Sequence, residues 1–453
     1  MLIKIVYNFI LAPVIYFAVS ILSVFNRRLR LSINARSTII DKLKQQRIRI
    51  NPYKITVLFH CSSMGEYKQI LPIVKKLTKE NNDGFNLILS LYSPSAFENI
   101  NKDKSPFCVV TYTPFDFYFV TKKFINIINP DIVLISKHDI WPNFIWELKK
   151  REVPVYLING LFADDSKMNE WYSGFFYRSI FSNITAILTI NEKNRNRFLN
   201  IFPYPEKVIV TGDTRFDAVL DEARSSNKIG DLEFLNNIEK VFVAGSSWPA
   251  GEIHVLNAWV RLKSIYKNAF LIVVPHEIGI DRIYKLESLC QEKELKTLVY
   301  SESDRNESID KYDVLIIDKI GILSTLYKYA SIAYVGGGFS RSGIHSVLEP
   351  AAYKIPVCFG PHLEKSPEAQ EMNSLNCGII FNNDRELFTA VNSLWSDKKL
   401  YSKISELSLD FIKNNSGATA KIIKIIKDET AAPKFDKNIS LTEEEFERLL
   451  NDK

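Results

Sequence analysis

The sequence predicts an α/β protein made of two doubly wound halves, preceded by a helix that reaches a membrane. Three observations predict this. Short apolar, β-rich runs alternate with segments of helical spacing from residue 51 onward, the alternation pauses over residues 221–240 before it restarts, and the first 25 residues contain a long uncharged stretch. The chain has 453 residues, of which 46% are hydrophobic and 24% charged, so two or three domains with sizeable cores are expected.

The N-terminal stretch is apolar enough to enter a bilayer. Residues 5–25 carry no charged side chain, and as a helix they are long enough to cross a hydrocarbon core of about 30 Å. Pro13 is expected to kink this helix, and Tyr7 and Tyr16 are candidates for the membrane interface. A spanning helix and an interfacial helix both stay open. A cleaved signal peptide is disfavoured, because no small-residue cleavage site precedes Asn26 and a strongly basic flank follows it.

The basic charge is concentrated near this stretch. Residues 1–50 carry nine basic side chains and one acidic one, whereas residues 51–453 sum to −2. A basic segment directly after an apolar helix is typical of contact with anionic head groups, and it places the body on the cytoplasmic side. A nucleic-acid partner is not expected, because such a protein would carry its basic charge on a folded face. The five cysteines are widely spaced without a CxxC pair, which predicts free thiols rather than a zinc site or disulfides.

The strand-like runs fall into two series. The first comprises residues 55–60, 86–92, 131–136, 153–160, 184–190 and 207–212. The second comprises residues 240–247, 269–276, 297–301, 313–318, 332–338 and 355–360. Continuous apolar strands separated by helices indicate parallel sheets covered on both faces. Two Rossmann-like halves facing a cleft make up the GT-B architecture, with ligands expected at the carboxyl ends of the strands. The predicted division is an anchor (1–25), an N-terminal acceptor-binding domain (26–225), a C-terminal nucleotide-sugar domain (226–430) and a polar tail (431–453).

The first half carries acidic residues where strands end. In HCSSMGE (60–66), Glu66 lies at the start of a helix, where free N–H groups stabilise a carboxylate. Glu66 is either a first-turn helix acid or a general base that removes the proton from an attacking sugar hydroxyl. Ser63 and Gly65 of the same turn, together with Asp139 after the strand 131–136, are candidates for binding the acceptor.

The second half carries turns suited to a nucleotide. GSSWPAGE (245–252) presents N–H and O–H donors that suit a phosphate, although it lacks the lysine of a P-loop. In YVGGGFSRSGIHSVLEP (334–350), the glycines allow close approach of a ligand or serve turn geometry alone, and Glu349 is placed to accept bonds from a ribose diol. No DxD pair follows a strand, so neither a metal nor a cofactor is expected.

Taken in order along nearly the whole chain, these stretches resemble the Kdo (3-deoxy-D-manno-octulosonic acid) transferase family. The resemblance is carried by HCSSMGE, KHDIWPN, VTGDTRFD, GSSWPAGE, VVPHE and the segment from VGGGF to FGPH. It implies that Glu66 is the catalytic base. It also implies that the CMP-Kdo donor is bound by Ser246, Ser247, His276, Gly337, Gly338, His345, Ser346 and Glu349. The implied reaction is inverting transfer of Kdo to the glucosamine disaccharide of a lipid A precursor, in lipopolysaccharide biosynthesis at the bacterial inner membrane.

The sequence also departs from the family pattern. Lys137 and Asp139 stand where many members have two glutamates, and Ser346 stands where many have asparagine. His276 occupies the position of a family arginine, which leaves His276 or Arg341 to offset the charge of the donor. Two other functions stay open: a GT-B enzyme that uses a UDP-sugar, such as a lipid-disaccharide synthase or sugar-nucleotide epimerase, and an inactive membrane scaffold.

Overall fold

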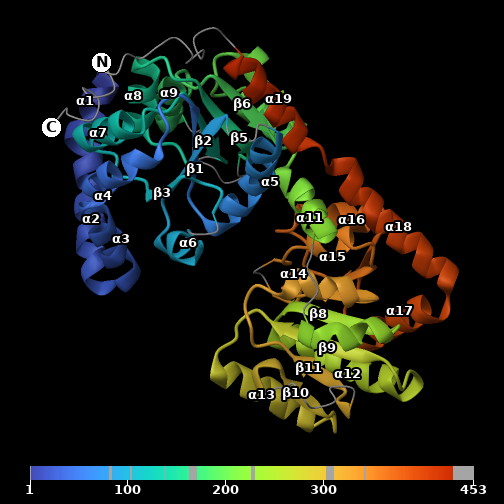
Figure 1. Ribbon diagram of the computed structural model, residues 1–453. Coiled ribbons are helices and arrows are strands. Elements are labelled where there is room, and N and C mark those ends of the chain that lie inside the picture. The colour runs from blue at the N-terminus through green and yellow to red at the C-terminus, as the bar shows by residue number, and fades with distance from the viewer. Residues whose placement is uncertain are drawn as a thin grey trace. The chain divides into compact units, whose positions relative to one another are not determined.

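The computed structural model shows two compact α/β units (Figure 1). It describes residues 2–80, 84–102, 105–137, 139–162, 171–225, 230–302, 311–340 and 343–431. His138, Arg341 and the polar tail from residue 432 lie outside these ranges. The first unit contains the chain up to Ala218 and again from Ser416, and the second contains Val219–Asn415.

The first unit is built on a seven-stranded sheet in which every pair of neighbouring strands is parallel. Its strand order is β3-β2-β1-β4-β5-β6-β7. The strands are β1 (Ile55–Cys61), β2 (Phe85–Leu91), β3 (Val109–Tyr112), β4 (Ile132–Ser136), β5 (Val155–Gly160), β6 (Ala186–Thr189) and β7 (Val208–Val210). Strand order changes direction next to β1, so the carboxyl ends of β1 and β4 flank the point where ligands bind in such sheets.

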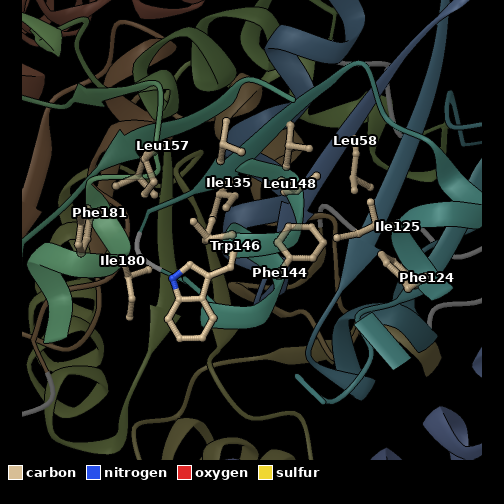
Figure 2. Close-up of a cluster of buried hydrophobic side chains, with 14 of the residues drawn as sticks. Leu58, Phe124, Ile125, Ile135, Phe144, Trp146, Leu148, Leu157, Ile180 and Phe181 are labelled. Atoms are coloured by element: carbon tan, nitrogen blue, oxygen red, sulfur yellow. The ribbon is translucent and has the colours of Figure 1, made fainter. Parts of the chain in front are cut away.

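Helices cover both faces of this sheet. They are α5 (Met64–Glu80), α6 (Pro94–Asn99), α7 (Tyr118–Ile128), α8 (Pro142–Lys150), α9 (Trp171–Phe181), α10 (Glu192–Phe198) and α19 (Ala418–Thr430), whereas α11 (Thr214–Ser225) contains the boundary between the two units. One core lies beneath α7, α8 and α9, and Figure 2 shows Trp146 and Phe144 of α8 at its centre, with Phe124 on one side and Phe181 on the other. The other core lies beneath α5 and α19. Burial on both faces explains the continuous apolar strands in the sequence.

Helix α19 belongs to the first unit, although the sequence analysis placed residues 416–430 in the second domain. Ile422, Ile423 and Ile426 on its buried face pack into the core that α5 covers, and the two helices lie side by side in Figure 1. Asp217 accepts hydrogen bonds from the backbone N–H groups of Gly417 (2.7 Å) and Thr419 (2.8 Å), which fixes the start of α19. An apolar helix face does not specify which of two similar sheets it covers, so periodicity alone could not assign α19.

The N-terminal stretch is helical throughout. It consists of α1 (Leu2–Val6), a π-helical turn η1 (Tyr7–Leu11) and α2 (Ala12–Phe25). Pro13 has no N–H to donate, and the π-helical turn ends two residues before it. The Ala12 N–H donates to the Tyr7 carbonyl, one residue further back than in an α-helix. Leu2–Phe25 is long and apolar enough to cross a membrane, and only 11% of its most apolar stretch is buried. The basic helix α3 (Arg27–Ser37) then runs alongside α2, and α4 (Ile39–Gln46) follows.

Polar side chains of this segment face the body of the first unit. Tyr7 is buried, and its hydroxyl donates to Asp116 Oδ2 at 2.9 Å. Tyr16 packs edge-on against Phe115, with ring centroids 5.2 Å apart. The expectation that Tyr7 faces a membrane interface is therefore wrong, because its hydroxyl finds its partner inside the protein.

The second unit repeats the architecture with the strand order β10-β11-β9-β8-β12-β13-β14, again with parallel neighbours. Its strands are β8 (Val241–Ser247), β9 (Phe270–Pro275), β10 (Thr297–Val299), β11 (Val314–Ile316), β12 (Ile332–Val335), β13 (Val357–Phe359) and β14 (Gly378–Ile380). Its helices are α12 (Pro249–Ile265), α13 (Ile280–Gln291), α14 (Leu323–Leu326), α15 (Leu348–Ala352), α16 (Pro367–Ser374), α17 (Asp384–Ser396) and α18 (Lys398–Asn415). A core lies on each side of the sheet.

The expected strands all form, with ends shifted by a few residues, and the structure adds β3 and β14. Both are short strands at the edge of a sheet. The segment 221–240, expected to be a linker with a helix, contains the end of α11 and a 3₁₀ segment at Gly230–Asn237.

Candidate active site

Glu66 is held at the carboxyl end of β1, in the first turn of α5. Its side chain is only 5% exposed. Ser63 precedes the helix, and its hydroxyl accepts the Glu66 N–H at 3.3 Å. The Glu66 carboxylate in turn accepts the Ser62 N–H at 2.6 Å and the Ser62 hydroxyl at 2.8 Å. This reciprocal bonding resembles a capping box, so Glu66 does serve as a first-turn acid. Acting as a base would additionally require it to exchange one Ser62 bond for a substrate hydroxyl.

Gly65 and Ser63 leave this turn open. Gly65 is exposed, and a Cβ built on it would meet only the Ser63 hydroxyl, at 3.9 Å. Ser63 is half-buried. The surface beside Glu66 is therefore accessible to a ligand.

A buried histidine fixes Asp139. His60, at the end of β1, is fully buried, and its Nε2 lies 2.9 Å from Asp139 Oδ2. Its Nδ1 lies 3.0 Å from the Ser90 hydroxyl and 3.1 Å from that of Thr113. The Asp139 side chain is 20% exposed, so the buried His60 holds the carboxylate while part of it stays accessible to a ligand. The sequence pattern predicted a role for Asp139 but none for His60, although a histidine in an otherwise apolar strand indicates a buried polar partner.

Glu66 and Asp139 both lie at the carboxyl end of β1. Burial raises the pKa of the Cys61 thiol well above its ordinary value, and the negative charges of Glu66 and Asp139 raise it further. Both carboxylates also bond to the end of β1, Asp139 to His60 Nε2 at 2.9 Å and Glu66 to the Ser62 N–H at 2.6 Å. The structure therefore brings together the predicted base and a predicted acceptor residue.

Arg36 supplies a positive charge to this edge. It belongs to the basic N-terminal segment, but it is buried, and its Nε donates to the Thr113 carbonyl at 2.7 Å. Its guanidinium lies over the rings of Tyr92 (4.6 Å) and Phe115 (5.1 Å). Burial lowers the pKa of Arg36, and the charge of Asp139 counteracts that shift. At least one of the basic residues assigned to head groups thus supports the site instead.

In the second unit, three aromatic rings gather at the carboxyl ends of β8, β9 and β12. The Trp248 and His276 rings stack at 4.8 Å, and those of His276 and His345 stack at 4.4 Å. The Trp248 indole N–H donates to His345 Nε2 at 3.0 Å, which leaves Nδ1 to carry the proton of a neutral ring. Burial, and then the neighbouring His276, lower the pKa of His345. The structure thus unites two predicted donor residues and adds Trp248, to which no role had been given.

The predicted glycines hold the surrounding loops together. Gly337 has a φ of +103°, and a Cβ there would lie 2.1 Å from the Gly343 carbonyl oxygen. A Cβ on Gly338 would lie 2.7 Å from the backbone nitrogen of Gly360. Both glycines are buried, so loop packing accounts for them.

The remaining donor candidates differ in accessibility. Ser247 is buried, and its hydroxyl donates to Glu252 Oε1 at 2.6 Å rather than facing outward. Ser346 is exposed, whereas Ser246 and Glu349 are half-buried. Ser366, which the sequence analysis missed, accepts the Ile344 N–H at 2.8 Å and so fixes the loop that carries His345.

Comparison with known proteins shows a similarity to Kdo transferases. Residues 32–218 match the family model described as 3-deoxy-D-manno-octulosonic-acid transferase. The 3-deoxy-D-manno-octulosonic acid transferase of Chlamydophila psittaci is 28% identical over 325 residues, which cover 71% of this chain and 73% of that protein. The chain is a homologue of Kdo transferases, at 23–28% identity over most of its length. As a Kdo transferase homologue, it is a glycosyltransferase.

Two further similarities concern length and fold. A bifunctional glycosyltransferase/methyltransferase of Fusobacterium nucleatum is 28% identical over 373 residues, 81% of this chain, but the match spans only 56% of that protein. The UDP-GlcNAc 2-epimerase of Neisseria meningitidis superposes with a TM-score of 0.59 at 14% sequence identity, covering 83% of this chain and all of that one. This similarity supports the GT-B fold of the Kdo transferase homologue and nothing about its substrate.

Proposed function

We propose that this glycosyltransferase transfers Kdo from CMP-Kdo to the glucosamine disaccharide of a lipid A precursor, at the cytoplasmic face of the bacterial inner membrane. The observation that carries the proposal is Glu66, a buried carboxylate held beside Asp139 at the carboxyl end of β1. Similarity to Kdo transferases supports the choice of sugar. The apolar segment Leu2–Phe25 supports a lipid acceptor, because it would hold the first unit at the membrane surface.

In the proposed reaction, Glu66 removes the proton from an acceptor hydroxyl as its oxygen attacks the anomeric carbon of Kdo. The new glycosidic C–O bond forms while the bond from that carbon to the CMP phosphate breaks. CMP leaves with the bonding electron pair, and the anomeric configuration inverts. Asp139, held by His60, orients the acceptor hydroxyl.

The second unit is proposed to hold the donor. The stacked imidazoles of His276 and His345 would face the phosphate, taking the place of the arginine that the family pattern has there. Glu349 would accept hydrogen bonds from the ribose diol. Gly337, Gly338 and Ser247 act indirectly, because they are buried and shape the loops. We propose that transfer needs no metal, because no DxD pair follows a strand in the sequence. Transfer should therefore persist in excess EDTA.

The test is transfer of radiolabelled Kdo from CMP-Kdo to a tetra-acylated lipid A precursor by the full chain in detergent. We expect transfer by the wild type and a loss of about 10² or more for Glu66→Gln, as for removal of a general base. Glu98→Gln, a change of an exposed glutamate in the same unit, is the matched control. Transfer that survives in Glu66→Gln would refute the base assignment. A folded wild type that transfers no Kdo, and that UDP but not CMP protects against thermal unfolding, would refute the donor.

A further inference from the structure

Arg36 of α3 joins the carboxyl ends of two neighbouring strands from inside the first unit. Its side chain is buried, and its Nε donates to the Thr113 carbonyl at 2.7 Å. Its Nη2 donates to the Tyr92 carbonyl. Thr113 directly follows β3 and Tyr92 directly follows β2, which pair in the sheet. The planar guanidinium thus bonds two carbonyls at once, a geometry that the flexible ammonium group of a lysine does not reproduce.

From Thr113 a chain of contacts leads to Asp139. The Thr113 hydroxyl lies 3.1 Å from His60 Nδ1, and His60 Nε2 lies 2.9 Å from Asp139 Oδ2. Arg36 therefore fixes the residue whose hydroxyl contacts the buried histidine, and the histidine fixes the carboxylate. The orientation of Asp139 depends on a side chain that does not touch it.

From Tyr92 a second chain leads to Glu66. The N–H of Ser93, the residue after Tyr92, donates to the Ser62 carbonyl at 3.2 Å. Ser62 in turn holds the Glu66 carboxylate through its own N–H and hydroxyl. Through separate residues, Arg36 thus supports both carboxylates of the acceptor edge.

The position of Arg36 is linked to the N-terminal apolar helix. α3 runs alongside α2, and the Phe115 ring that lies under the Arg36 guanidinium also packs against Tyr16 of α2. The Asn8 and Asn143 side chains exchange amide hydrogen bonds of 3.0 and 2.9 Å, which hold the start of this helix on the first unit. The segment that would contact lipid is therefore packed against the support of the acceptor edge.

We propose that Arg36 is a positioning residue for transfer, and that it makes the N-terminal segment part of the acceptor site as well as a membrane attachment. This inference rests on the proposed function for the identity of the reaction. Asp139 and Glu66 must both be correctly placed when the acceptor hydroxyl attacks, and a misplacement of about 1 Å can lower the rate about 10²-fold. Loss of the Arg36 bonds would move both groups.

The first test measures transfer to the tetra-acylated precursor in detergent micelles, where the enzyme does not have to bind a bilayer. Arg36→Lys keeps the charge and removes the fork, and Arg30→Lys makes the same change at an exposed arginine of α3 as the matched control. We expect Arg36→Lys to lower kcat/KM for the acceptor about ten- to hundredfold with CMP affinity unchanged, and Arg30→Lys to change neither. A role in membrane attachment alone predicts wild-type transfer by both variants, and that result would overturn the proposal.

Thr113→Val is a second, smaller change. It removes the hydroxyl beside His60 Nδ1 and keeps the backbone carbonyl that Arg36 bonds. Because the Ser90 hydroxyl stays 3.0 Å from the same nitrogen, we expect kcat/KM to fall only about three- to tenfold. Wild-type kcat/KM in Thr113→Val would overturn the chain from Arg36 to Asp139, even where Arg36→Lys fails to fold.

The second test does not depend on transfer. Nuclear magnetic resonance of the full chain in detergent, with isotope-labelled histidine, reports the ring N–H groups of its six histidines, and His60→Gln identifies the His60 signal. We expect the His60 ring proton to exchange with water about tenfold or more faster in Arg36→Lys than in the wild type or Arg30→Lys. An exchange rate in Arg36→Lys equal to that of the wild type would refute the inference. The expected change in a protein that transfers no Kdo would support the hold of Arg36 on His60 while refuting the proposed reaction.

Discussion

The carboxyl edges of the two sheets share one architecture but carry opposite chemistry. In the first unit the edge is built on carboxylates: Glu66 is bonded by its own helix turn, and Asp139 is held by His60. In the second unit the edge is built on stacked aromatic rings: the Trp248 indole N–H donates to His345, and the His276 ring stacks against both. Carboxylates suit the removal of a proton, and imidazoles beside glycine-packed loops suit a nucleotide phosphate. Parallel sheets of this kind provide the same location for ligands, and the side chains at that location determine what is done there.

The largest expected difference between the two edges is the effect on stability of replacing one glycine from each edge by alanine. In Gly338→Ala the new Cβ meets the Gly360 backbone, so we expect the second unit to lose about 2–4 kcal/mol of unfolding free energy, with a corresponding loss of CMP binding. In Gly65→Ala the Cβ has room within a helix, so stability should be unchanged or higher by up to about 1 kcal/mol. Denaturant unfolding and calorimetric titration with CMP measure both effects.

Gly65→Ala also reports on the acceptor. A folded variant with reduced transfer would support a ligand that approaches Gly65 closely. Wild-type stability and CMP affinity in Gly338→Ala would contradict the packing role assigned to that glycine.

An intermediate effect is expected at Asp139. Asp139→Asn removes the charge but keeps the shape, and we expect kcat/KM for the acceptor to fall about 10–100-fold while CMP affinity stays constant. Asp131→Asn is the matched control: Asp131 precedes the opposite end of β4, where it accepts the Thr56 N–H at 2.7 Å, so it should affect stability rather than transfer. If Asp139→Asn weakened CMP binding, the division of roles between the two edges would be wrong.

The smallest expected effect is a pH dependence at the second edge. Because the pKa of His345 is lowered, its ring is neutral near pH 7.5, and an anionic phosphate favours the protonated form. The CMP affinity of the wild type, relative to His345→Gln, should therefore rise about three- to tenfold as the pH falls from 7.5 to 5.5. The ratio of the wild-type affinity to the His345→Gln affinity removes the contribution of protons that CMP itself binds, because that contribution is the same for both proteins. Calorimetric titration in two buffers of different ionisation enthalpy would show the proton uptake that accompanies CMP binding. A pH-independent affinity ratio would contradict the predicted protonation of His345.

Much of this molecule follows from its sequence. Apolar strands buried on both faces require continuous Val, Ile and Leu runs, so both sheets and the pause between them were predictable, as was the position of Glu66 directly after β1. The edge strands β3 and β14 were missed, although the equally short edge strands β7 and β10 were predicted, so strand length alone does not explain the misses. The family resemblance supplied the base and donor assignments, which no spacing rule would have provided alone.

Tertiary structure decided how those residues are used. Periodicity showed that α19 has an apolar face, but only packing showed that this face covers the first sheet. From the sequence, Tyr7 belongs to an apolar membrane anchor and Arg36 to its basic flank. In the structure both are buried, because Tyr7 donates to Asp116 and Arg36 donates to the Thr113 carbonyl. The same holds for three residues that hydrogen-bond to partners 22 to 97 residues away in the sequence: His60, Trp248 and Ser366. Local pattern reports burial and secondary structure, whereas the partner of a buried polar group is set by which distant segment the fold brings within hydrogen-bonding distance.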